Sequence, residues 1–121
     1  MPPDSIAEIE RLFASRQRDR LAAIVSADVI EEHRTAPVGD HTPALSALLT
    51  ALRQAPVASK LALLETEPGA EWMIIRISGA PGVPHDLSDT ARYTTLDAAL
   101  HAVFLRRLAE LGLLAGPRRP A

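Results

Sequence analysis

The chain has 121 residues, of which 47% are hydrophobic and only 3% aromatic, and its 13 basic and 15 acidic side chains leave a net charge of −2. This length predicts one domain with an aliphatic core, and the slight acidic excess argues against nucleic-acid binding. The chain has no cysteine, which excludes disulfides and thiolate chemistry. It shows no signal-peptide start and no run of apolar residues long enough for a membrane span, so we expect a cytoplasmic protein.

Residues 5–32 are predicted to be helical. Ser5 or Asp4 is a candidate N-cap, and Ser5 with Glu8 has the spacing of a capping box. A polar stretch over residues 14–20 separates two apolar stripes, so either a long helix is exposed in its middle or two helices meet there. A further break is possible near Ser26 to Asp28, where Asp28 could cap a short helix. The stripes are Ile6, Ile9 and Phe13, and then Leu21, Ile24 and Val25.

A loop over residues 34–43 precedes a second helical region. Thr42 is the expected cap and Pro43 suits the first helical turn. Leucines at 45, 48, 49 and 52 recur with helical spacing. The helix should end before Pro56.

Residues 60–78 predict a β-hairpin whose turn is centred on Pro68-Gly69. Symmetric pairing about that turn puts Trp72, Ile74 and Arg76 on one face. Met73, Ile75 and Ile77 take the other. Because both faces are apolar and a two-stranded sheet is marginal alone, both faces are expected to need cover.

A loop over residues 79–92 leads to a last helix that begins near Thr95, with Thr94 and Asp97 at capping-box spacing. Gly112 or Gly116 should end it. The fold class is therefore α+β: N-terminal helices, a central two-stranded antiparallel hairpin, and a C-terminal helix packed on it. We expect a single domain over residues 1–116 and a disordered tail over 117–121. The main apolar stripe of the last helix is Leu100, Phe104, Leu108 and Leu111, widened by Leu96 and Val103.

Few residues are candidates for chemistry. Glu31, Glu32, His33 and His41 have the side chains of metal ligands, but their spacing fits no compact metal site, and a helix-end role for His33 is favoured. His85-Asp86 could be a base with an orienting carboxylate, although a local turn hydrogen bond from Asp86 is the simpler interpretation. No nucleophile or phosphate-loop motif is present.

The segment from His101 to Arg107 combines a histidine and two arginines with apolar residues on one helix. Asp97, four residues earlier, could hydrogen-bond His101 as a structural pair. Arg106 is expected on the side opposite Leu108, where it could bind a carboxylate or carbonyls of a partner. Arg107 is either at an interface or in solvent.

Four stretches together resemble the small subunit of N,N-dimethylformamidase. They are Ile30 to His33, the loop with Pro37, Gly39 and His41 to Pro43, the hairpin with Trp72 at the start of its second strand, and His101 to Leu108. The N-terminal helix matches only in character, and this chain has fewer aromatic residues.

The resemblance implies an α+β accessory subunit in a hetero-oligomer with a large catalytic subunit, which hydrolyses N-substituted formamides with a mononuclear iron. It implies no catalytic, cofactor or metal residue on this chain. The charge balance and the lack of a long apolar run argue separately against a nucleic-acid or membrane partner. The alternatives are a free-standing ligand-binding or regulatory module that uses the hairpin and last helix, and a metal enzyme that uses Glu32, His33 and His41. The expected contacts with the large subunit are His33, Pro37, His41, Trp72, Arg76, His101, Arg106 and Arg107.

Overall fold

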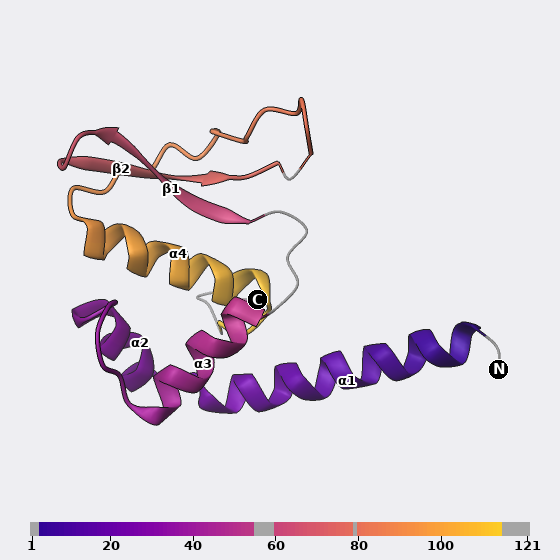
Figure 1. Ribbon diagram of the computed structural model, residues 1–121. Coiled ribbons are helices and arrows are strands. Elements are labelled where there is room, and N and C mark those ends of the chain that lie inside the picture. Colours follow the sequence, from indigo (N-terminus) through magenta and orange to yellow (C-terminus); the bar gives the residue numbers. More distant parts are fainter. Residues whose placement is uncertain (1–2, 55–59, 79, 115–121) are drawn as a thin grey trace, which may run out of the picture.

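The structure is a computed structural model, and it describes residues 3–54, 60–78 and 80–114. Over these residues four helices and one two-stranded sheet confirm the α+β prediction (Figure 1). The expected tail over residues 117–121 lies outside the described residues. The elements in chain order are α1 (Pro3–Ile24), α2 (Ala27–Thr35), α3 (Pro43–Gln54), β1 (Leu61–Glu67), β2 (Glu71–Arg76) and α4 (Leu96–Glu110).

The predicted helix over residues 5–32 is two helices, because the chain breaks at residues 25 and 26. Ser26 is extended and its hydroxyl accepts a hydrogen bond from the amide of Val29 at 3.2 Å, which caps α2. The prediction of Asp28 as the cap is wrong. Asp28 lies in the first turn, where its charge favours the helix dipole. Helix α1 begins at Pro3, so Ser5 lies inside it and is not its N-cap.

The core lies between α2, α3 and α4. As predicted, Leu45, Leu48 and Leu52 are buried on one side of α3, and the described part of this helix extends to Gln54. The predicted end before Pro56 falls at residues outside the described ones. Thr42 caps α3 weakly, with its hydroxyl 3.4 Å from the amide of Leu45. The buried core cluster consists of Val29, Leu45, Leu48, Leu52, Phe104, Leu108 and Leu113.

The hairpin has the predicted register. Leu63 pairs with Ile74 and Leu61 with Arg76, which is symmetric about Pro68-Gly69, and an irregularity lies between Glu65 and Glu67. At the turn the amide of Ala70 donates to the carbonyl of Glu67 at 2.9 Å, and Gly69 has φ +67°. Glycine suits this left-handed position because a Cβ would crowd the backbone.

Both faces of the hairpin are covered within this chain around the centre of β2. Met73 and Ile74 point to opposite faces, yet their exposed fractions are only 4% and 1%. Helix α4 lies along one face (Figure 1), and because Arg76 binds Glu110 of α4, that face carries Ile74. The predicted need for cover is therefore met here without a partner.

The segment between β2 and α4 follows the free edge of β2. Trp72 and Tyr93 exchange two backbone hydrogen bonds of 2.8 and 2.9 Å, and Arg76 and Asp86 exchange two of 3.1 and 2.8 Å. These bonds fix the segment beside the sheet.

Helix α4 is capped by Thr95, whose hydroxyl accepts from the amide of Ala98, so the expected cap at Thr94 is one residue too early. Gly112 ends the helix, as one of the two predicted glycines. The amide of Leu113 donates to the carbonyl oxygen of Leu108 at 2.8 Å, and the amide of Gly112 donates to the carbonyl oxygen of Ala109 at 3.0 Å. These two hydrogen bonds form a Schellman motif.

Candidate functional site

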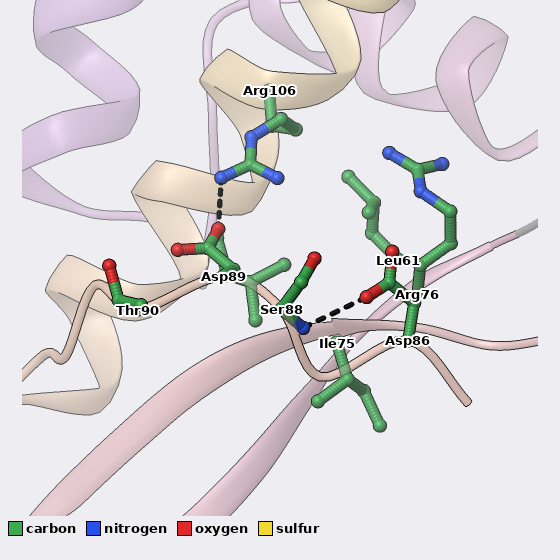
Figure 2. A pocket seen from close by; sticks show the side chains of 9 residues that line it. Leu61, Ile75, Arg76, Asp86, Ser88, Asp89, Thr90 and Arg106 are labelled. Atoms are coloured by element: carbon green, nitrogen blue, oxygen red, sulfur yellow. Dashed lines mark hydrogen bonds and ion pairs between the residues drawn. The ribbon is translucent and has the colours of Figure 1, made fainter. Parts of the chain in front are cut away.

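A polar cleft of 410 Å³ lies between the hairpin, the segment after it and α4 (Figure 2). Ile74 lines it, and two arginines reach it from different elements, Arg76 from β2 and Arg106 from α4. Acidic side chains from the segment after β2 face them. The full lining is Leu61, Ile74, Ile75, Arg76, Asp86, Ser88, Asp89, Thr90 and Arg106.

Arg106 and Asp89 form an ion pair across this cleft (Figure 2). The guanidinium hydrogen bond holds the pKa of the Asp89 carboxyl below its usual range, and the same bond raises the pKa of Arg106. The Asp89 carboxylate also accepts the amide of Ala91 at 2.9 Å. Arg106, which the sequence suggested for a partner subunit, thus already has a carboxylate partner in its own chain.

The other two predicted interface arginines also bind within the chain. Arg76 pairs with Glu110 and ties the end of β2 to the end of α4. Arg107 donates to the carbonyl oxygen of Leu52 in the last turn of α3. That carbonyl needs an outside donor because the residue four positions on is Pro56, which has no amide N–H.

His33 and His101 form the second polar feature, at the contact between α2 and α4. Their Nδ1 atoms are 2.9 Å apart, so one ring donates and the other accepts. His33 is 4% exposed and stacks on Phe104 with ring centroids 4.0 Å apart and planes 16° from parallel. His101 therefore pairs with His33, and the predicted Asp97 pairing does not form.

Burial favours the neutral form of both imidazoles. Burial first, and then positive charge on His101 and on His41, together lower the pKa of His33 to about 4. Burial also lowers the pKa of His101, as does the charge of Arg34, while the nearby Glu31 carboxylate opposes the shift. The pair can take up one added proton, which makes one ring a cation that donates to the other. A second added proton would make both rings cations facing each other.

The candidate metal ligands have other roles. Both oxygens of Glu32 bind Thr42, accepting its amide at 2.7 Å and its hydroxyl at 2.6 Å, and these bonds lower the pKa of the Glu32 carboxyl. The Nε2 of His41 lies 2.7 Å from the carbonyl oxygen of Ala36. In the part of the chain that the structure describes, no group of three or more His, Asp or Glu side chains could hold a metal ion. Glu32, His33 and His41 thus fasten α2, its loop and α4 together and do not share a centre.

The remaining predicted residues lie apart from one another. His85 accepts the amide of Ser78 at 3.1 Å, and Asp86 accepts the amide of Ser88 at 2.8 Å, which confirms the local turn bond and gives no base–carboxylate pair. Ser88 also holds the pKa of the Asp86 carboxyl low. Trp72 is half-buried in the sheet and Pro37 is half-buried in the loop after α2.

Sequence reasoning missed Asp89 and Glu110, the partners of the two cleft arginines. Asp89 lies 17 residues before Arg106, and Glu110 lies 34 residues after Arg76. No local pattern marks either pairing. The only available signal was the long polar loop itself, because loops of that length often carry contacts of their own.

Comparison with known protein families identifies the family to which this chain belongs. The chain matches the family described as N,N-dimethylformamidase alpha subunit over residues 8–116, and it belongs to this family. The match associates the chain with a multi-subunit amide hydrolase. Comparison with curated proteins gave no match. Among the described helices, none combines the length and the hydrophobicity that crossing a bilayer requires.

Proposed function

We propose that this chain is the small, non-catalytic subunit of an N,N-dimethylformamidase-like amide hydrolase, and that it stabilises a large iron-containing catalytic subunit in a cytoplasmic hetero-oligomer. The observation that carries the proposal is the family match over residues 8–116. The reaction would be hydrolysis of an N-substituted formamide to formate and an amine, carried out on the large subunit.

The contacts that the polar side chains make within this chain support an accessory role. Hydrolysis of an amide needs an activated water or nucleophile and a group that stabilises the developing oxyanion. In this chain Arg106 is bound to Asp89, Arg107 to the Leu52 carbonyl, and His33 to His101. Each of these contacts links two elements of the fold, which is a structural role.

The cleft favours a second candidate, the free-standing ligand-binding module. Its volume of 410 Å³ is within the range of small-ligand pockets, and two arginines line it. The ion pair to Asp89 weakens this alternative, because an anionic ligand would have to displace a carboxylate that is already in place.

An assay of separated and recombined chains tests the proposal. The purified chain, the proposed large catalytic chain, and their mixture are each incubated with N,N-dimethylformamide, and formate and bound iron are measured. We expect no formate from this chain alone, iron on the large chain, and full activity in the mixture. Formate production by this chain alone, or tight iron binding to it, would refute the accessory role.

A further inference from the structure

The N-terminal half of α1 carries apolar side chains that nothing in the described chain covers. All residues from 6 to 14 are exposed, and the helix projects beyond the other elements (Figure 1). The apolar stripe that the sequence predicted here therefore does not pack on this chain's own core. The exposed fractions are 49% for Ile6, 45% for Ile9, 51% for Leu12 and 66% for Phe13.

These side chains form one wide face. With about 100° of rotation per residue, Ile6 and Phe13 lie about 60° and 40° to one side of Ile9, and Leu12 lies about 60° to the other. A face about 120° wide is broader than the narrow seam by which two helices meet. It fits a groove whose walls contact the helix on both sides, as in helix-in-groove recognition.

The same face becomes basic further along the helix. Arg16 and Arg20 each lie within about 20° of the direction of Ile9, and both are exposed. The carboxylates on this segment lie on its flanks, with Asp19 about 80° and Glu8 and Glu10 about 100° from the direction of Ile9. The surface that receives this face should therefore be apolar at one end and acidic at the other.

A second copy of this chain fits the face poorly. Parallel pairing would set Arg16 and Arg20 against their own copies. Antiparallel pairing centred on the apolar residues would join Ile6 to Phe13 but leave both arginines without carboxylates. The apolar segment of eight residues is about 12 Å long, which is too short for two helices to bury the roughly 1,000 Å² of a stable interface.

We infer that residues 6–20, hereafter the docking arm, seat α1 in an apolar groove of the large partner subunit, with Arg16 and Arg20 against carboxylates at one end of that groove. The inference rests on the proposed function, because it takes the partner to be the large subunit. It is separate from the contact set expected from the sequence, which stays a prediction, although the three arginines of that set bind within this chain.

Two variants on opposite sides of the docking arm test the inference. Phe13→Asp puts a charge on the apolar face, whereas Arg11→Asp changes a residue about 200° from Ile9, on the opposite face. Both residues are exposed, so both variants should fold, which circular dichroism checks. Each tagged chain is co-expressed with the large chain, and the dissociation constant of the purified complex is measured.

We expect Phe13→Asp to weaken the complex at least about thirtyfold, as for a central hot-spot residue, and Arg11→Asp to change it less than about threefold. Charge reversal at Arg16 should give a smaller loss and a lower salt dependence. If wild type and Phe13→Asp bind the large chain equally, the docking arm is wrong but the proposed function stands. If the wild-type chain binds no large chain and instead forms a dimer that Phe13→Asp dissociates, both are wrong.

Discussion

At the scale of single residues, the His33–His101 pair makes the stability of this protein depend on pH. The pKa of His33 is about 4 in the folded chain but about 6.5 when unfolded. Between these values the unfolded chain binds more protons, so stability rises with pH. The contribution of the buried, neutral His33 to the free energy of unfolding is therefore present above about pH 6.5 and is lost as the pH falls toward 4. The depressed pKa of His101 acts in the same direction.

We therefore predict that the free energy of unfolding falls by about 2–3 kcal/mol between pH 7 and pH 4 through this pair, since each pKa unit corresponds to about 1.4 kcal/mol. His33→Phe keeps a ring against Phe104 and should flatten the dependence. His85→Gln, at an exposed loop histidine, should leave it unchanged. Urea unfolding at several pH values measures this. If the free energy of unfolding changes with pH equally in wild type and His33→Phe, the histidine pair is not responsible for the pH dependence.

Arg106 gives a second prediction, which separates a role in the fold from a role in assembly. Its pairing with Asp89 is partly exposed, with side-chain exposures of 37% and 20%. Arg106→Ala should therefore cost on the order of 1 kcal/mol, less at high salt. In a double-mutant cycle with Asp89→Ala, most of this loss of stability should appear as the coupling free energy between Arg106 and Asp89. An unchanged stability together with a lost complex would favour the interface role expected from the sequence.

At the scale of elements, the start of α2 depends on one hydroxyl. Ser26→Ala removes the oxygen that accepts the Val29 amide and should destabilise the protein by about 1 kcal/mol. Asp28→Ala, which removes only a favourable charge in the first turn, should cost about half as much. Thermal unfolding of the two variants checks the order. A larger loss for Asp28→Ala would assign the cap to Asp28 instead.

Local patterns predicted most of the elements. The leucine spacing of α3, the Pro68-Gly69 turn with its register, and the end of α4 at Gly112 all follow from interactions between residues close in sequence. The predicted N-caps were one or two residues away from the observed ones, because Ser26 and Asp28, or Thr94 and Thr95, are about equally favoured as N-cap residues. Only the backbone path decides between them.

The candidate site was harder to predict, because its contacts join residues far apart in the sequence. His33 and His101 are 68 residues apart, and Arg107 and Leu52 are 55 apart. The residue types were recognised as unusual, but His101 was paired with Asp97, and Arg107 was placed at an interface or in solvent. Proline at position 56 was a readable signal that the Leu52 carbonyl needs a donor. No comparable signal identified Arg107 as that donor.

At the scale of the whole molecule, the docking arm should be the least protected part of the described chain. A helix without tertiary contacts is marginal in water, and residues 6–14 are all exposed. Amide hydrogens of this segment should exchange rapidly in the isolated chain, while those of α3 and α4 exchange slowly. Binding of the large subunit should then protect the segment. Protection equal to that of α3 in the isolated chain would contradict this prediction.

The central claim is that this chain stabilises a large catalytic subunit. A titration of the purified large chain with this chain, followed by heating and assay of N,N-dimethylformamide hydrolysis, tests that claim most directly. We predict that the surviving activity rises with added chain and saturates at a fixed molar ratio, and that Phe13→Asp moves saturation to much higher concentration. Surviving activity that is independent of this chain at every ratio would contradict the claim.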